Sequence, residues 1–405
     1  MLKCELKKFF SKKINRIVIV VMMQLAVILS CVAIGSVRYT DERGQVSTGI
    51  TSASKLATDR NKWKGQLTED KITEIVNVEQ ELNKKYPEEI PDDEYGKNIQ
   101  SYEEIKDFVI GILTPDSDWD ESVLKKLTDE EIKNIYVTYK DNMNKMVDEY
   151  GKTSEQKEFI SKQYEKTEFP LNYESKDSWD TMILYAETYG IILAVAIGFL
   201  VAGIFAEEFQ TNSEDIFFST KYGRSKATKN KILSGILITT IIYWVSMIIM
   251  FLILSITMGI SGFNTPYQIS EPYSIYNITY GEYYLLVVSC GFIGSLLSAA
   301  ITMFVTTKTR NSNIAICIPF FMFCVMPFIG RALSSFTKFF RLTPDMLMNI
   351  MNAAKDIMVL QIGNTVFRQI PFIMLLYTVI SIILIPFIYK SYCNYGLKKS
   401  KRKSN

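Results

Sequence analysis

The sequence predicts an all-α polytopic membrane protein with six transmembrane helices and an α-helical extracellular domain inserted between the first two. Apolar residues make up 48% of the chain, but they gather in six blocks that hold almost no charge. A long polar segment with helical periodicity separates the first and second blocks, and Lys and Arg concentrate on alternate connections. The near-neutral net charge of +2 therefore conceals two kinds of segment, one suited to lipid and the other suited to water.

Each apolar block is long enough to cross a bilayer as one helix. A transmembrane helix needs about 20 apolar residues and satisfies its own backbone hydrogen bonds in lipid. The predicted transmembrane segments are residues 17–37, 182–206, 232–258, 283–307, 311–330 and 369–389. Residues 1–16 and 344–361 are amphipathic but too short or too polar to span. We expect the first to lie on the cytoplasmic leaflet and the second to lie at the outer interface or re-enter the membrane there.

The distribution of Lys and Arg predicts the orientation. Residues 1–16 and the tail 390–405 carry six each, the connection 207–231 carries five, and the short connection after the fourth block carries two. Six crossings place these four segments on one side, which the positive-inside rule makes cytoplasmic, so both termini are expected in the cytoplasm. The outer loop 331–368 also carries five Lys and Arg and departs from the rule. The Lys and Arg residues of the other four segments together outweigh those of this loop in setting the orientation.

Residues 38–181 form the predicted extracellular domain. They contain 33 Asp and Glu against 21 Lys and Arg, a net charge of −12. Apolar residues recur at helical spacing, most clearly over residues 132–150. Capping boxes are predicted at Ser101–Glu104 and Thr128–Glu131. In each, the hydroxyl and the carboxylate would accept hydrogen bonds from backbone N–H groups at the start of a helix. We therefore expect a compact helical domain.

Several kinds of chemistry are excluded by what the sequence lacks. The chain contains no histidine, no GxxxxGK[ST] phosphate-binding loop and no CxxC pair. Histidine-based catalysis and metal binding are therefore absent, and ATP hydrolysis by a phosphate-binding loop must occur on another chain. We expect no catalytic site, no metal site and no cofactor on this chain, and no nucleic-acid partner.

Three residues inside the predicted spans are candidates for a substrate path. Glu187 is the carboxylate nearest a membrane interior, and such acids are usually functional. Gly291 and Gly294 place small residues along the fourth span, which permits close helix approach. The alternative for Glu187 is a solvated or hydrogen-bonded residue at the membrane boundary, and for the two glycines it is ordinary helix packing.

The connection 207–231 has the most distinctive pattern in the chain. Acidic residues open it, an aromatic pair lies in its middle, and basic residues close it. The residues predicted to contact a partner are Glu207, Glu208, Phe217, Phe218, Tyr222, Gly223, Arg224, Lys226 and Lys231. A solvated loop that is amphipathic by chance is the alternative.

The chain resembles permease subunits of type 2 ABC exporters from low-GC Gram-positive bacteria. The resemblance rests on the order of segments, on the region 344–361, and on the connection 207–231 with its Tyr222-Gly223-Arg224-Ser225-Lys226 element before Lys231. It implies a bacterial cell membrane, a separate ATPase that carries ATP and Mg²⁺, and a second permease copy, identical or paralogous. It also implies that Phe217 and Phe218 enter a groove on the ATPase. The inserted domain departs from the simplest family members, which have a short loop there.

Three functions remain open from the sequence. The leading one is export of a peptide or another amphipathic substrate. The second is a mechanotransmission-type ABC permease, in which ATP hydrolysis moves the outer domain without transport across the bilayer. The third is a surface receptor whose acidic domain binds a cationic peptide, as in bacteriocin immunity or sensing.

Overall fold

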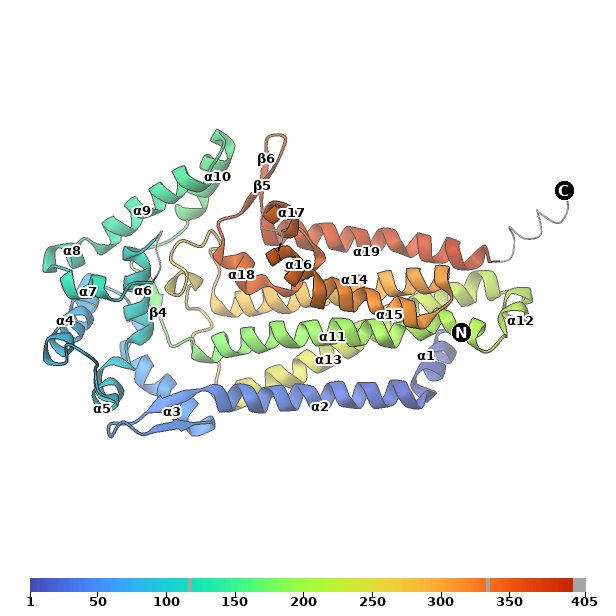
Figure 1. Ribbon diagram of the computed structural model, residues 1–405, viewed down its shortest axis with the longest axis horizontal. Coiled ribbons are helices and arrows are strands. Elements are labelled where there is room, and N and C mark those ends of the chain that lie inside the picture. The colour runs from blue at the N-terminus through green and yellow to red at the C-terminus, as the bar shows by residue number, and fades with distance from the viewer. Residues whose placement is uncertain (116–118, 333–335, 396–405) are drawn as a thin grey trace.

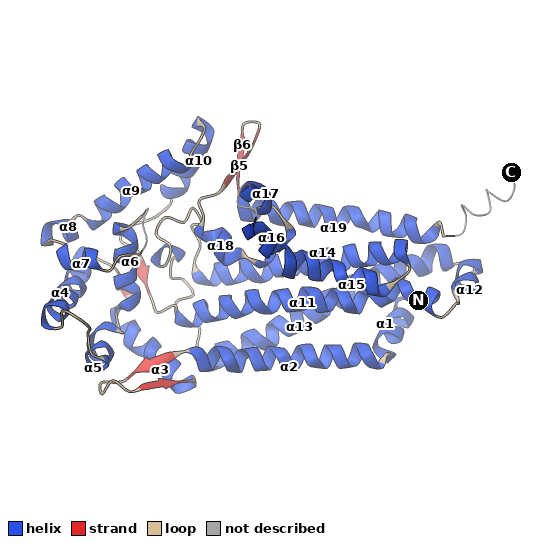
Figure 2. Ribbon diagram, viewed as in Figure 1, coloured by secondary structure: helices blue, strands red, loops and turns tan. Residues whose placement is uncertain are grey.

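The protein is a bundle of long helices with a smaller helical domain at one end (Figure 1). The computed structural model describes residues 1–115, 119–332 and 336–395, so residues 396–405 of the predicted basic tail lie outside the described part. Strands occur as three short antiparallel pairs in the described residues, and helices dominate (Figure 2). Six helices in those ranges are long and apolar enough to cross a membrane, which confirms the predicted number.

The candidate spans extend beyond the predicted apolar blocks. They are α2 (Lys13–Ser36), α11 (Asp177–Gln210), α13 (Thr228–Met258), α14 (Tyr280–Thr309), α15 (Ser312–Phe320) continued by α16 (Met326–Ala332), and α19 (Gln369–Cys393). Each helix continues through polar residues at one end at least, and α11 and α14 do so at both ends, because helix formation does not stop where the apolar run stops. A separate short helix, α1 (Leu2–Ser11), precedes the first span and ends in an extended residue, Lys12.

Small side chains let the central helices α11 and α14 pack closely with α15. The Ser298 hydroxyl of α14 donates to the Ala194 carbonyl of α11 at 2.6 Å. A Cβ atom on Gly198 would lie 2.7 Å from Cγ of Pro319, so glycine is needed at that contact. After Pro319 the fifth span changes to a π-helical turn, residues 321–325, before α16 begins. The fifth span is therefore irregular next to Pro319, as expected for a helix with an internal proline.

The inserted domain contains α3 to α10 and two short strand pairs. Its elements are β1 (Arg38–Thr40), β2 (Val46–Thr48), α3 (Ile50–Arg60), β3 (Gly65–Gln66), α4 (Glu69–Lys85), α5 (Asp92–Glu94), α6 (Glu103–Leu113), α7 (Ser122–Lys126), α8 (Asp129–Lys133), α9 (Ile135–Tyr150), α10 (Ser154–Tyr164) and β4 (Asn172–Tyr173). The predicted capping box at Thr128 and Glu131 is confirmed, with both hydrogen bonds present. The one predicted at Ser101 is wrong, because α6 starts after Tyr102 and Glu104 enters an ion network.

The connection between α13 and α14 packs onto the inserted domain, which the sequence did not predict. The Tyr164 hydroxyl donates to the Tyr273 carbonyl at 2.9 Å, and the Tyr273 hydroxyl donates to the Ile112 carbonyl at 2.6 Å. A third contact comes from the hairpin before α19, where Thr153 donates to the Gln361 side chain at 2.8 Å. The domain is therefore held to the bundle by more than its two chain connections.

The segment 344–361 is not the single amphipathic helix that the sequence predicted. It forms a 3-10 helix (Pro344–Met348), then α18 (Ile350–Lys355), then strand β5 (Val359–Ile362), which pairs with β6 (Thr365–Arg368). Asn349 interrupts the helix with φ −141° and ψ 47°. Gly363, at φ +60°, allows the tight turn of the hairpin. The first part is buried inside the bundle, so its apolar residues pack against helices.

Two of the five basic residues of the 331–368 loop form ion pairs. Lys355 contacts Glu271 at 2.6 Å, and Arg341 forms an ion pair with Asp356. The short helix α17 (Thr337–Phe340) lies just before Arg341.

Candidate partner-docking site at one end of the bundle

The segment 207–231 lies at the end of the bundle where both described ends of the chain also lie (Figure 1). Most of it is helical. Residues 207–210 end α11, Glu214–Ser219 form α12, and Gly223–Ala227 form a π-helical turn that leads into α13. The predicted loop is therefore a short folded elbow between two candidate spans.

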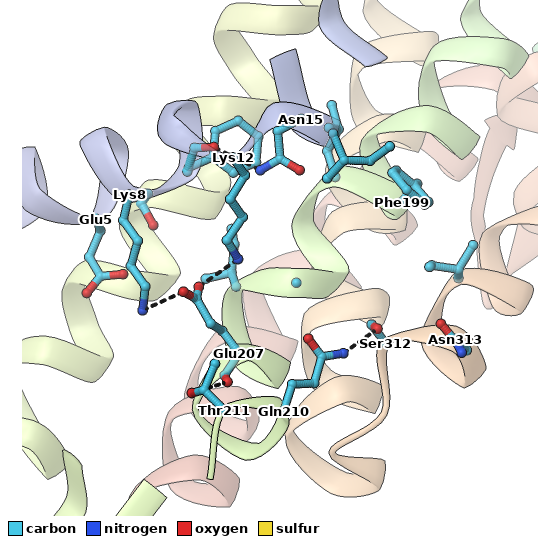
Figure 3. Close-up of a pocket in the computed structure, with 17 residues that line it drawn as sticks. Glu5, Lys8, Lys12, Asn15, Phe199, Glu207, Gln210, Thr211, Ser312 and Asn313 are labelled. Atoms are coloured by element: carbon cyan, nitrogen blue, oxygen red, sulfur yellow. Dashed lines mark hydrogen bonds and ion pairs between the residues drawn. The ribbon is translucent and has the colours of Figure 1, made fainter. Parts of the chain in front are cut away.

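Ion pairs fix the start of this elbow to the amino-terminal helix. Glu207 contacts Lys12 at 2.7 Å and Lys8 at 3.3 Å, and Figure 3 shows both lysines directed at this carboxylate. Glu208 contacts Lys8 at 3.2 Å and Lys231 at 2.8 Å. We call Lys8, Lys12, Glu207, Glu208 and Lys231 the elbow ion cluster. It joins α1, α11 and α13.

The innermost pair of the elbow ion cluster is buried. The side chains of Glu208 and Lys231 are 5% and 1% exposed. Lys231 also donates to the Ile204 carbonyl at 2.8 Å, and the Tyr392 hydroxyl donates to Glu208 at 2.8 Å. A buried ion pair is tolerated when further hydrogen bonds satisfy both groups, as they do at this pair. Glu208 and Lys231 therefore brace the elbow internally and do not present their charges to a partner.

The aromatic pair of the elbow also packs inside the chain. Phe218 is only 6% exposed, and its ring lies 5.0 Å from the rings of Tyr392 and Tyr395. Phe217 is half-buried, with its ring 5.8 Å from that of Tyr392 and 5.6 Å from the Lys231 ammonium. The hypothesis that both rings enter a groove on a partner does not fit these positions, because Phe218 already fills a site formed by the end of α19.

Gly223 and Arg224 lock the second half of the elbow. A Cβ atom on Gly223 would lie 1.9 Å from the Phe217 carbonyl oxygen, so any other residue would displace the backbone. The Arg224 guanidinium donates to the carbonyls of Cys393 at 2.6 Å and Tyr395 at 2.7 Å. A cation at this position satisfies carbonyls at the carboxyl end of α19 and interacts well with its dipole. The elbow and the last span thus form one unit.

An isoleucine, a tyrosine and two lysines are among the exposed residues of the elbow. Ile216 is 72% exposed and Tyr222 is 40% exposed. The ammonium groups of Lys221 and Lys226 lie 5.6 and 4.9 Å from the Tyr222 ring. We call Ile216, Lys221, Tyr222 and Lys226 the docking face. The sequence does not distinguish Ile216 from Phe217 and Phe218 as an outward-facing residue, since a helix of six residues is too short for periodicity to separate its faces.

The three candidate residues for a substrate path take part in packing. Glu187 accepts a hydrogen bond from the Met351 backbone N–H at 2.9 Å, at the start of α18. A Cβ atom on Gly291 would lie 2.4 Å from the Tyr243 hydroxyl, and one on Gly294 would lie 2.4 Å from Cε of Met348. The contacts of Gly291 and Gly294 favour ordinary helix packing. The backbone hydrogen bond of Glu187 favours the alternative of a hydrogen-bonded residue.

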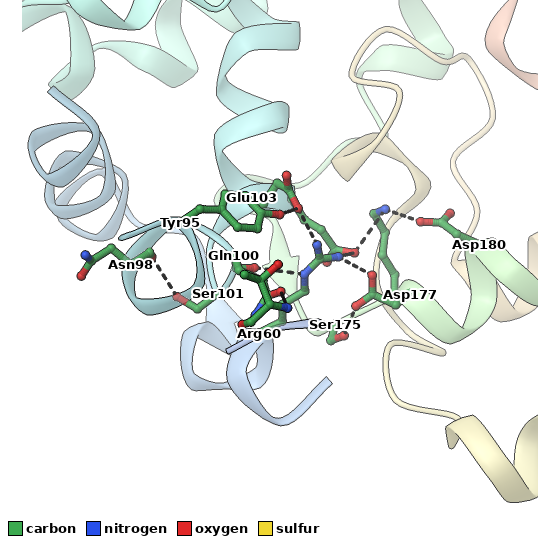
Figure 4. A network of polar contacts seen from close by, with 12 residues as sticks. Arg60, Tyr95, Asn98, Gln100, Ser101, Glu103, Ser175, Asp177 and Asp180 are labelled. Atoms are coloured by element: carbon green, nitrogen blue, oxygen red, sulfur yellow. Dashed lines mark hydrogen bonds and ion pairs between the residues drawn. The ribbon is translucent and has the colours of Figure 1, made fainter. Parts of the chain in front are cut away.

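A second ion network lies at the opposite end of α11, where the inserted domain meets the bundle (Figure 4). Arg60 at the end of α3 contacts Glu103 at 2.8 Å and Glu104 at 2.9 Å, and it also pairs with Asp177. Lys176 contacts Glu104 at 3.4 Å. We call these five residues the junction ion network. It connects α3 and α6 to the first turn of α11.

Charge compensation keeps Glu104 and Arg60 of the junction ion network ionised. Burial opposes ionisation of Glu104, but Lys176, Arg60 and a hydrogen bond from Tyr173 hold the pKa of this carboxyl below its usual value. Burial likewise opposes the charge of Arg60, but Glu104 and Asp177 raise the pKa of its guanidinium above the usual value. The charges of Glu104 and Arg60 are therefore present at neutral pH and depend on one another.

Helix α11 is anchored by charged groups at both ends. It runs 34 residues without interruption from the junction ion network to the elbow ion cluster. At 1.5 Å per residue its length is about 50 Å. Helix α11 therefore joins the elbow to the inserted domain without a break.

The chain matches no family model, no curated protein and no solved structure.

Proposed function

We propose that this chain is the transmembrane permease subunit of an ABC exporter, which couples ATP hydrolysis on a separate ATPase to export of a peptide or another amphipathic substrate. One observation carries the proposal. The elbow between α11 and α13 is braced from within by the elbow ion cluster, while its docking face is exposed. A rigid elbow with an outward apolar and basic surface can receive a mechanical input from a bound partner and pass it to the helices.

The partner must supply the energy. This sequence has no phosphate-binding loop of the GxxxxGK[ST] type, so ATP and Mg²⁺ are proposed to bind the ATPase subunit. The elbow contacts α1 through Glu207, α13 through Lys231 and α19 through Arg224. A force on the docking face would therefore act on several candidate spans together.

Charge supports a cytoplasmic location for the elbow. The end of the bundle that carries α1, the elbow and the last described residues is rich in Lys and Arg, which the positive-inside rule assigns to the cytoplasm of a bacterial cell. The inserted domain would then be extracellular. A second permease copy, identical or paralogous, would complete the transporter.

The variant Ile216→Asp tests this proposal. The full chain is co-expressed with candidate ABC ATPase subunits from the same genome, and association and ATP hydrolysis are measured in the purified complex. Ile216→Asp should weaken association at least about 10-fold, because a charge replaces an apolar contact in the interface. Val137→Asp, at a 57% exposed position of the inserted domain, is the matched control and should have no effect. Equal association for both variants, or none for the unaltered chain, would refute the proposal.

A mechanotransmission function is the second candidate, favoured by the charged anchors at both ends of α11. In that case, ATP hydrolysis would move the inserted domain through α11 without carrying a substrate across the bilayer. ATP-dependent accumulation of a substrate in inside-out vesicles separates the two functions. Accumulation supports export, whereas ATP-dependent motion of the domain without accumulation supports mechanotransmission.

A further inference from the structure

The inserted domain contains a cavity of about 360 Å³ between α4, α5, α6 and α7 (Figure 1). Five acidic residues, two lysines and two tyrosines are among the residues that line it. Its size falls in the range of about 300–1,000 Å³ that is typical of small-ligand sites. We call it the domain cavity. It lies apart from the elbow and from the junction ion network.

A buried carboxylate lines the domain cavity. Glu79 of α4 is only 5% exposed. It accepts hydrogen bonds from the Tyr102 hydroxyl at 3.1 Å and from the Asn83 side chain at 3.2 Å, and both donors are neutral. The ion pairs found within the described ranges of the chain do not include Glu79. Because a buried carboxylate is stabilised most by a hydrogen-bonded cation, a ligand ammonium would complete this site.

A buried ammonium lines the same cavity. Lys106 of α6 is 8% exposed. Its ion pair in the described part of the chain is with Glu121 at 3.9 Å, which is too long for a hydrogen bond. Glu121 also lines the domain cavity, so this pair places the ammonium beside it. A lysine ammonium carries three donors, which suit a ligand carboxylate.

Glu79 and Lys106 approach the domain cavity from neighbouring positions. Lys106 follows Tyr102 by one helical turn, and its backbone N–H donates to the Tyr102 carbonyl at 2.9 Å. The Tyr102 hydroxyl in turn bonds to Glu79. A buried acid and a buried base therefore share one cavity without forming an ion pair with each other. An α-amino acid, which carries an ammonium and a carboxylate on one carbon, supplies the complementary group for each.

The rim of the domain cavity is acidic. Glu88, Glu89 and Asp92 are exposed there, and Lys125 is the exposed basic residue of the lining. We call Glu88, Glu89 and Asp92 the acidic rim. Exposed carboxylates attract cations, so the acidic rim favours a ligand with a second ammonium group.

We propose that the domain cavity binds a free basic α-amino acid such as lysine. Its α-ammonium contacts Glu79, its carboxylate contacts Lys106, and its side-chain ammonium points toward the acidic rim. A neutral ligand would leave both buried groups without an ionic partner, and a simple cation would leave Lys106 without one. The inference goes beyond the proposed transport function and requires neither an ATPase nor a second permease copy.

The test compares three probes on the full chain in detergent by isothermal titration calorimetry. L-Lysine is the complete ligand, cadaverine lacks its carboxylate, and L-norleucine lacks its side-chain ammonium. L-Lysine should bind at least about 10-fold more tightly than either of the others. Equal binding of cadaverine would identify a site for simple cations, and equal binding of norleucine would remove the role of the acidic rim. Either result, or no binding of L-lysine, overturns the proposal.

Lys106→Met tests the carboxylate contact. Methionine retains much of the apolar stem and removes the ammonium. The variant should bind L-lysine about 10-fold more weakly and cadaverine as before, a difference that a general loss of structure would not produce. Lys162→Met is the matched control, because Lys162 is 62% exposed and does not line the domain cavity.

Glu79→Gln tests the ammonium contact independently. Glutamine has nearly the same shape and keeps an acceptor for the Tyr102 hydroxyl, so the chain should still fold. All three probes carry an ammonium and should bind about 10-fold more weakly to this variant. Glu158→Gln, at a 67% exposed side chain outside the domain cavity, is its control. Unchanged L-lysine binding in both Lys106→Met and Glu79→Gln would place the amino acid elsewhere and overturn the proposal.

Discussion

Replacing Arg60 by Met removes the cation at the centre of the junction ion network. Arg60 contacts Glu103 and Glu104 and also pairs with Asp177, so one substitution leaves three carboxylates without this partner. Glu104 is the most affected, since its side chain is 5% exposed. The methionine has a similar length and no charge, so the packing of the side chain stem is largely retained.

The expected loss of stability follows from the burial of these charges. Removal of one partner from a buried ion pair typically costs about 3–5 kcal/mol, because the remaining charge is left uncompensated. Lys176 still contacts Glu104 at 3.4 Å, so we expect the lower limit of about 3 kcal/mol. A loss of this size increases the open population of the domain junction about 100-fold. The double variant Arg60→Met with Glu104→Gln should recover part of the loss, because the buried charge is gone.

Hydrogen exchange of the full chain in detergent measures this effect locally. Protection of the backbone amides in α3 and α6 should fall about 100-fold in Arg60→Met. Lys62→Met is the control, because Lys62 is 67% exposed and its ion pair with Asp59 contributes at most about 1 kcal/mol. If the two variants exchange alike, the junction ion network does not hold the domain to α11, and the reasoning is refuted.

Two further substitutions test burial and backbone geometry. Asp107→Asn should stabilise the domain, because burial and then the charge of Glu103 raise the pKa of Asp107 from 3.8 to about 6. The penalty on its ionised form is absent below pH 3.8 and complete above pH 6, so melts at pH 8 should show a gain on the order of 1–3 kcal/mol that shrinks at pH 5. Gly223→Ala should disrupt the elbow, since its Cβ would meet the Phe217 carbonyl oxygen at 1.9 Å. Gly35→Ala, with open space around its Cβ, should be neutral or stabilising by up to about 1 kcal/mol in the same melts; equal melting temperatures for the two alanine variants would contradict the assignment.

The sequence predicted the candidate spans well because the signal for a span is local. About 20 consecutive apolar residues suffice, and neither a neighbour nor a partner is needed to recognise them. The capping box at Thr128 was predicted for the same reason, because its two hydrogen bonds join residues three apart. The capping box predicted at Ser101 does not form, because Glu104 instead pairs with Arg60, which lies 44 residues away in the sequence.

The segment 207–231 shows where the sequence becomes insufficient. Its acidic, aromatic and basic residues were recognisable, but their roles depend on α1 and α19. Lys8 reaches Glu208 across 200 residues, and Arg224 reaches the Cys393 carbonyl across 169 residues. No periodicity within α12 reveals that Phe218 is buried under the end of α19 while Ile216 faces outward.

The sequence by itself determined that six segments are suited to lipid and that a long acidic segment lies between the first two. Both properties follow from composition summed along the chain. The tertiary structure was needed to separate the residues of the elbow that are internal braces from those that form the docking face. The reason is that burial is set by neighbours distant in sequence, whose ion pairs and ring contacts form only after the helices pack.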